Sequence, residues 1–123
     1  MSAAPSSRTP APSWLRVPDD ANELARGVWP TSGSRADDGV VSVGGVPTTD
    51  LAERFGTPLY VLDEDDVRGH ARRTLAAFRD AAAAHGVQAR VYYAGKAFLS
   101  TEVVRWVTEE GLAVDVCTGG ELA

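Results

Sequence analysis

The chain has 123 residues, 44% of them hydrophobic, and a formal net charge of −5 at pH 7, enough for one small domain or part of a larger one. The acidic balance argues against nucleic acid or an anionic membrane surface as the main partner, and no apolar stretch reaches the roughly 20 residues of a membrane-spanning helix. The opening residues lack the apolar segment of a secretory signal and the single cysteine cannot form an intramolecular disulfide, so we expect a cytoplasmic protein.

Residues 1–38 are expected to form an irregular N-terminal arm. Five prolines, interleaved with Ser, Thr and Gly, interrupt any helical or strand period in this segment. The arm also carries Trp14 and Trp29, which favour docking onto other structure over full disorder.

Residues 39–56 predict a short strand followed by a short helix. Valines in GVVSVGGV indicate the strand, which would turn at Gly44 and Gly45. The helix would contain DLAERF, with Thr49 or Asp50 available as its cap and a glycine closing it.

From residue 57 onward, strand-like and helix-like segments alternate. Apolar runs predict strands at 57–63, 89–97 and 112–120. Asp63 and Ser100 can cap the two intervening helices, whose apolar residues recur at steps of three and four. This order predicts parallel strands, right-handed crossovers and helices covering the sheet. Three strands cannot close a barrel of about 250 residues, and the chain stops just inside another helix, so we expect a fragment of a longer protein.

Lys96 is the first candidate for chemistry. It is the only lysine, against eleven arginines, and it lies at the predicted C-terminal end of the second strand, where α/β folds bind ligands. Arginine replaces lysine in most ion pairs, but only lysine can supply a neutral amine that attacks a carbonyl. A lysine that simply reaches water at a strand end is the alternative, and position alone leaves it open.

Other reactive side chains carry less information. Asp115 interrupts the apolar run LAVDVC, and an active-site role or a structural hydrogen bond would explain a buried carboxylate there equally well. Cys117 has no histidine near it in sequence and is expected to be a small packing residue. His70 and His85 lack the spacing of metal ligands, so no metal site is expected.

Three ordered segments closely resemble the diaminopimelate decarboxylases of the actinobacterial type. They are FGTPLYVLDEDDVR, VYYAGKAFLSTEVVRWV and GLAVDVCTGGELA. The resemblance implies a fold-type III enzyme that depends on pyridoxal 5'-phosphate (PLP). Its fold would be an alanine-racemase-like (β/α)8 TIM barrel joined to a C-terminal β domain. Residues 57–123 would then be the first βαβαβ part of the barrel, cut before it closes, and residues 39–56 would pack on the β domain.

The resemblance also implies roles for individual residues. Lys96, in the pattern Y-x-A-x-K-A, would bind PLP covalently, and Asp115, in the pattern D-V-x-x-G-G-E-L, would lie near the cofactor. Glu121 matches the second pattern, but the resemblance assigns it no role. The reaction implied is decarboxylation of meso-2,6-diaminopimelate to L-lysine and CO2, the last step of bacterial lysine biosynthesis, by a homodimer. The fragment alone would be inactive, since the glycine-rich loop for the PLP phosphate would follow Ala123.

Two alternatives remain open from the sequence. Related PLP decarboxylases act on ornithine, arginine or carboxynorspermidine, but they tend to carry an A-V-K-C-N-like sequence where this chain has AGKAF. A non-catalytic PLP-binding protein built on the same barrel is the other alternative. The retention of Lys96 as the only lysine speaks against it.

Overall fold

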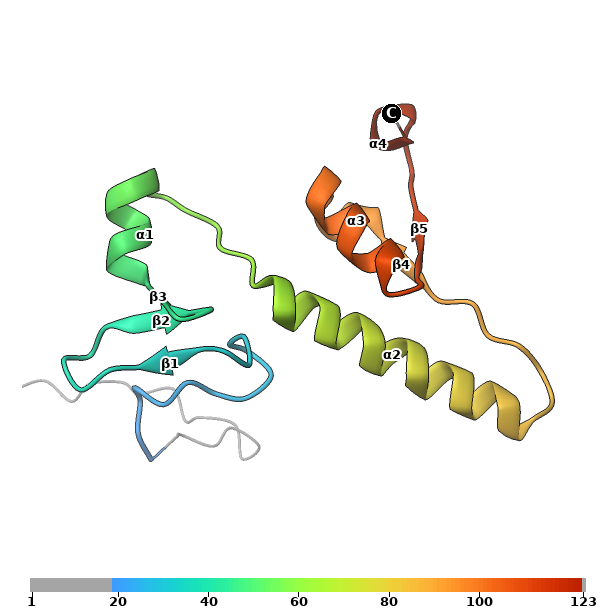
Figure 1. The fold of residues 1–123 in the computed structure, drawn as a ribbon, viewed down its shortest axis with the longest axis horizontal. Coiled ribbons are helices and arrows are strands. Elements are labelled where there is room, and N and C mark those ends of the chain that lie inside the picture. The colour runs from blue at the N-terminus through green and yellow to red at the C-terminus, as the bar shows by residue number, and fades with distance from the viewer. Residues whose placement is uncertain (1–18, 123) are drawn as a thin grey trace, which may run out of the picture.

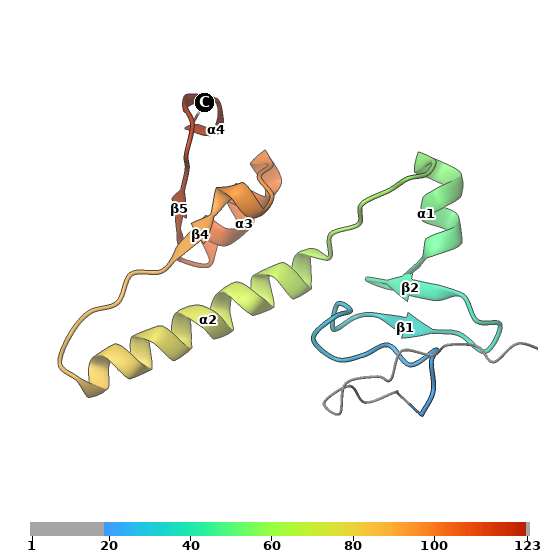
Figure 2. The same ribbon diagram turned by 180° about the vertical axis from the view of Figure 1, so that it is seen from behind.

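The structure is a computed structural model, and it describes residues 19–122. Residues 1–18 of the predicted arm, including Trp14, lie outside this range. The described elements are mixed α and β, which confirms that part of the predicted fold class. A small sheet and helix α1 lie near the start of the long helix α2, whereas α3, β4 and β5 lie along its side (Figures 1 and 2).

The first sheet is antiparallel and has the strand order β1-β2-β3. Its strands are β1 (Ser34–Arg35), β2 (Val41–Val43) and β3 (Val46–Pro47). Gly44 and Gly45 join β2 to β3 with φ angles of 58° and 78°. Two successive positive φ angles define the tight hairpin turn that glycine favours, so the predicted turn is confirmed.

Strand β1 corrects the prediction that the arm is irregular up to residue 38. Both of its residues are exposed, so no apolar alternation marks the strand in the sequence. The guanidinium of Arg35 donates hydrogen bonds to the carbonyl oxygens of Gly39 at 2.7 Å and Asn22 at 3.1 Å. Pairing with β2 and these side-chain bonds, rather than burial, therefore hold this segment.

Helix α1 (Thr48–Phe55) confirms the predicted short helix. No side chain caps its first turn, so neither Thr49 nor Asp50 has the expected capping role; both lie inside the helix. Gly56 ends the helix with a φ of 80°, a conformation that residues with a Cβ rarely adopt.

The apolar run at residues 57–63 does not form the predicted strand. It connects α1 to α2 without pairing with any described strand, and Tyr60 is 94% exposed. A strand needs hydrogen bonds to a neighbouring strand, and Pro58 has no backbone N–H to give. The apolar composition of residues 57–63 therefore indicated a strand, but no described strand pairs with this segment.

Helix α2 (Glu64–Ala84) begins as predicted. The Asp63 carboxylate accepts a hydrogen bond from the Asp66 backbone N–H at 3.2 Å, which satisfies one of the free donors of the first turn. Ala71 and Leu75 on the predicted apolar face are buried, whereas Phe78 is 57% exposed. The buried part of this face thus ends after Leu75.

The second sheet is a parallel pair, β4 (Tyr92–Ala94) and β5 (Ala113–Asp115). Helix α3 (Thr101–Glu109) connects them, and the Ser100 hydroxyl caps it by accepting from a backbone N–H at 3.3 Å. Helix α4 (Gly119–Leu122) follows. The predicted parallel pairing and the cap are confirmed, although both strands are shorter than the apolar runs indicated.

The core lies between α2, α3 and the β4–β5 pair. Its buried members are Ala71, Leu75, Val103, Val107 and Leu112. Val107 and Val103 are each 2% exposed, because α3 packs its apolar face against both α2 and the strands.

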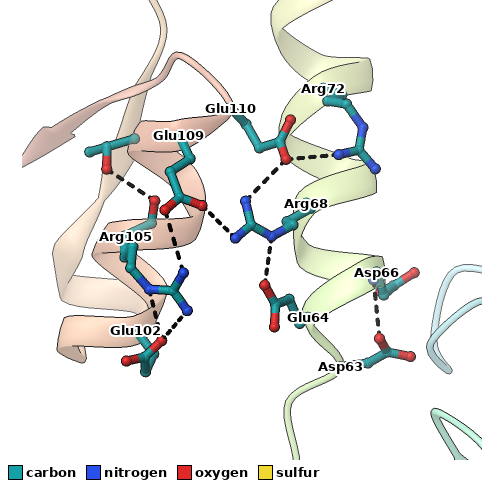
Figure 3. Close-up of polar contacts among 10 residues, drawn as sticks. Asp63, Glu64, Asp66, Arg68, Arg72, Glu102, Arg105, Glu109 and Glu110 are labelled. Atoms are coloured by element: carbon teal, nitrogen blue, oxygen red, sulfur yellow. Dashed lines mark hydrogen bonds and ion pairs between the residues drawn. The ribbon is translucent and has the colours of Figure 1, made fainter.

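A shared arginine joins α2 to α3 next to this core (Figure 3). Arg68 donates to Glu64 at 2.7 Å, to Glu109 at 2.6 Å and to Glu110 at 3.2 Å, and only 15% of its side chain is exposed. Arg72 donates to the same Glu110 oxygen at 2.8 Å. The hydrogen bond from Arg68 lowers the pKa of Glu109 and raises that of Arg68 itself.

Two hydroxyl residues of the arm attach it to the start of α2. Thr31 donates to the Asp66 carboxylate from its backbone N–H at 3.0 Å and from its hydroxyl at 2.8 Å. Ser32 donates to Asp63 and accepts from the Gly44 N–H at 2.8 Å. The hydrogen bonds from Thr31 lower the pKa of Asp66. The described end of the arm is therefore docked, through Thr31 and Ser32. The tryptophans do not account for this docking in the described residues, because Trp29 is 41% exposed and Trp14 lies outside them.

None of the helices found between residues 19 and 122 has the length and apolar character to cross a bilayer.

Candidate functional site

Lys96 lies just beyond the C-terminal end of β4. It is the middle residue of a 3-10 turn, Gly95–Ala97, and not part of the strand as the sequence predicted. The chain leaves this turn through Phe98 in an extended conformation. The Lys96 side chain is exposed, and within residues 19–122 its amine makes no ion pair or hydrogen bond. The apolar neighbours in the sequence therefore do not enclose it here.

Asp115 is the last residue of β5 and lies at the same edge of the sheet. In the parallel register, Asp115 is the partner of Ala94, two residues before Lys96. The carboxyl ends of both strands thus bring the two predicted site residues to one edge. Asp115 is exposed, so it is not the buried carboxylate considered from the sequence, and burial does not require a partner for it.

Gly95 allows the two strands to approach closely beside Lys96. It is buried, and a Cβ at this position would lie 2.9 Å from the backbone oxygen of Asp115 and 3.4 Å from the Leu99 side chain. Such a short contact with backbone forces the chain to move. The residue that precedes the lysine is therefore restricted to glycine by space.

Tyr93 contributes a contact that the sequence reasoning missed. Its hydroxyl donates to the carbonyl oxygen of Phe98 at 2.6 Å and so bridges the 3-10 turn. No pattern in the sequence indicates this bond, because it depends on the direction in which the chain leaves the turn.

Glu121 and Thr118 form a reciprocal cap at the start of α4. The Glu121 carboxylate accepts from the backbone N–H groups of Cys117 at 2.6 Å and Thr118 at 3.2 Å. The Thr118 hydroxyl accepts from the Glu121 N–H at 3.3 Å. This is the capping box, a threonine followed three residues later by glutamate, and that spacing is visible in the sequence. A structural role thus accounts for Glu121.

The remaining reactive side chains do not form a second site. Cys117 is exposed, which corrects the expectation of a packed residue in a buried strand. His70 lies 3.8 Å from the Asp66 carboxylate, and His85 caps the C-terminal end of α2. Nowhere in the described part of the chain do three His, Cys, Asp or Glu side chains gather in a way that could hold a metal ion.

The edge formed by Lys96 and Asp115 can provide a primary amine and a carboxylate at neighbouring strand ends. A PLP cofactor requires such an amine for its covalent attachment. The Lys96 amine is exposed and bound to no described residue, so the residues present fit this requirement.

Comparisons with known proteins identify relatives of the chain. No protein-family model matches the chain. It is 55% identical over 100 residues to the diaminopimelate decarboxylase of Mycobacterium tuberculosis (strain ATCC 25618 / H37Rv), a match that covers 81% of this chain and 21% of the relative. It is 48% identical over 122 residues to the diaminopimelate decarboxylase of Corynebacterium efficiens, which covers 99% of this chain and 25% of the relative.

A more distant relative has the same name. The chain is 44% identical over 84 residues to the diaminopimelate decarboxylase of Bacillus subtilis (strain 168), covering 68% of this chain and 18% of the relative. The resemblance indicated by the three sequence segments is therefore confirmed. The chain spans about a fifth to a quarter of the length of the curated relatives it matches.

Proposed function

We propose that this chain, which is similar over most of its length to diaminopimelate decarboxylases, is part of an enzyme of that activity. The enzyme would convert meso-2,6-diaminopimelate to L-lysine and CO2 with PLP as cofactor, at the end of bacterial lysine biosynthesis. The observation that carries the proposal is Lys96. It is the only lysine of the chain, and it lies with an exposed side chain at the carboxyl edge of a parallel strand pair.

Lys96 would hold the cofactor through its Nζ atom. When bound, PLP supplies an electron sink that stabilises the charge left as the α-carboxylate departs. The amine of Lys96 would also hold and return a proton at Nζ. Because Gly95 is packed against β5, the backbone that carries the Lys96 amine would keep the same position throughout the reaction.

Asp115 would lie beside the cofactor, at the end of the neighbouring strand. Its exposed carboxylate is an acceptor for hydrogen bonds from a bound ligand. The same edge would receive further ligand-binding groups from other parts of the enzyme, among them the glycine-rich loop for the PLP phosphate.

The chain would take its place in the whole enzyme as follows. Residues 1–38 would form the N-terminal arm, residues 39–56 would pack on a C-terminal β domain, and residues 57–123 would supply the first part of an alanine-racemase-like TIM barrel. In that barrel, residues 57–63 would gain the strand partner that the described elements do not provide. We also propose a cytoplasmic homodimer.

The experiment uses the gene product that contains this chain. The protein is reduced with borohydride, and the pyridoxyl adduct is located by peptide mass spectrometry, with and without prior incubation with meso-2,6-diaminopimelate. We expect an adduct on Lys96 that the substrate displaces, and none in a Lys96→Arg variant, which keeps the charge but cannot provide a neutral amine.

Other outcomes would contradict the proposal in distinct ways. An adduct elsewhere, or none in a folded protein, would refute Lys96 as the attachment site. Displacement and CO2 release with ornithine, arginine or carboxynorspermidine, but not with diaminopimelate, would assign the chain to a related decarboxylase. Binding of PLP without CO2 release from any of them would indicate a non-catalytic protein.

A further inference from the structure

The turn that carries Lys96 is short, and no side chain of the described residues caps its start. It consists of Gly95, Lys96 and Ala97 between the end of β4 and the extended residue Phe98. A 3-10 turn has poorer hydrogen-bond geometry than an α-helix. Contacts from outside the turn therefore decide how firmly the lysine backbone is held.

One side of the turn is fixed by close packing. Gly95 is buried against the Asp115 backbone oxygen and the Leu99 side chain, so its movement toward β5 is blocked. Packing at one residue prevents approach in one direction, but it does not set the path along which the chain leaves the turn.

The other side is closed by the hydroxyl of Tyr93. It donates to the Phe98 carbonyl oxygen at 2.6 Å, across five residues. Tyr93 itself lies in β4 and packs against the buried core cluster. The bond thus ties the exit of the turn to a residue whose own ring is held by the core.

We propose that Tyr93 is a positioning residue for Lys96: its hydroxyl, bound to Phe98, holds the lysine turn in the conformation that receives PLP. The inference rests on the proposed function. Tyr93 touches neither cofactor nor substrate in this role. Because the hydrogen bond already restricts the turn, the turn loses less conformational entropy when PLP binds to the lysine, and binding is tighter. Removal of the hydroxyl should weaken PLP binding without removing the attachment site.

The test is Tyr93→Phe in the gene product that contains this chain, because phenylalanine keeps the ring and loses only the donor. The cofactor is removed with hydroxylamine, and PLP is titrated back while absorbance is recorded. A lost hydrogen bond of this kind corresponds to a roughly 2- to 10-fold higher Kd for PLP. Mass spectrometry after borohydride reduction should still locate the adduct on Lys96, at lower occupancy for a given PLP concentration.

Three variants serve as controls. Tyr92→Phe removes the hydroxyl of the neighbouring tyrosine. Tyr92 is 53% exposed and its hydroxyl makes no hydrogen bond to a described residue, so this variant should leave the Kd for PLP unchanged. Val103→Ala creates a cavity in the core, and it should lower the melting temperature without changing the Kd more than about 2-fold. Substitution of Tyr93 by 4-aminophenylalanine restores a donor and should restore the Kd.

The outcomes separate this inference from the proposed function. If the unmodified protein gives no adduct on Lys96, the proposed function fails. If it gives the adduct and Tyr93→Phe binds PLP equally well, only the positioning role is overturned. The role is also overturned if Val103→Ala weakens PLP binding as much as Tyr93→Phe does. The same holds if Tyr93→Phe does not fold, or if the 4-aminophenylalanine variant stays weak.

Discussion

Replacement of Gly95 by alanine tests how closely the two parallel strands approach each other beside Lys96. The φ angle of Gly95 is not positive, so alanine is compatible with the backbone conformation, and only space opposes it. The new Cβ would lie 2.9 Å from the Asp115 carbonyl oxygen. An ordinary contact begins at about 3.4 Å, so the strand ends must separate by about 0.5 Å.

The expected magnitude follows from two opposing effects. Overpacking of this kind typically costs about 1–3 kcal/mol. In the opposite direction, alanine lowers the conformational entropy of the unfolded chain, which stabilises the folded protein by about 0.4–1 kcal/mol. Gly119→Ala is the matched control, because its Cβ would meet nothing within 4 Å and its φ is not positive either. We therefore expect Gly95→Ala to have a free energy of unfolding at least about 1 kcal/mol below that of Gly119→Ala.

Urea unfolding of the gene product that contains this chain provides the measurement. Trp106 packs against the core cluster. With Trp14 and Trp29 replaced by phenylalanine, its fluorescence reports the unfolding of the elements around Lys96. Equal midpoints and slopes for Gly95→Ala and Gly119→Ala would refute the close approach of the strands. A stable Gly95→Ala variant that binds PLP normally would also remove the argument that this glycine fixes the lysine backbone.

Further predictions concern the caps and charges. Ser100→Ala should lower the free energy of unfolding by about 1 kcal/mol, because the Val103 N–H loses its acceptor. Ser100→Asp keeps an acceptor and should leave the free energy of unfolding unchanged. Urea titration of the two variants measures the difference. Hydrogen bonds from Thr31 lower the pKa of Asp66, so this carboxylate stabilises the fold above about pH 4, and the contribution is lost as the pH falls further. Asp66→Asn should therefore reduce the loss in the free energy of unfolding as the pH falls below about pH 4. An unchanged pH dependence would contradict this role of Asp66. Arg68→Gln breaks the ion pair with Glu64 inside α2 and the pairs with Glu109 and Glu110 that join α2 to the end of α3. It should lower the melting temperature, by less at about 1 M NaCl than at low salt; a loss independent of salt would mean that packing dominates.

The sequence predicted those elements whose signals are local. Asp63 and Ser100 cap the helices that follow them, because a short polar side chain next to an amphipathic run acts within four residues. The run at 57–63 has an equally clear apolar pattern, but a strand also depends on a partner, which the local sequence does not describe. Strand β1 has no apolar pattern at all and forms through pairing and the contacts of Arg35.

The candidate site shows the same division. The parallel arrangement that the sequence predicted brings Lys96 and Asp115 to one edge. The sequence did not predict that Lys96 lies in a 3-10 turn, that Asp115 is exposed, or that Tyr93 binds Phe98, and it left the exposure of Lys96 open. These features depend on where each strand stops, which is set by pairing across the sheet.

The reciprocal cap at α4 has a consequence for phosphate recognition. The double glycine before Glu121 forms the start of α4, four residues after the end of β5, and glycine-rich helix starts of this kind bind phosphate groups in other proteins. Here the Glu121 carboxylate already accepts the hydrogen bonds of two backbone N–H groups. A phosphate dianion would have to displace this carboxylate and bear its repulsion at close range. The chain's own carboxylate thus occupies the N–H groups at this helix start, and a phosphorylated ligand at the Lys96 edge would need other donors for its phosphate.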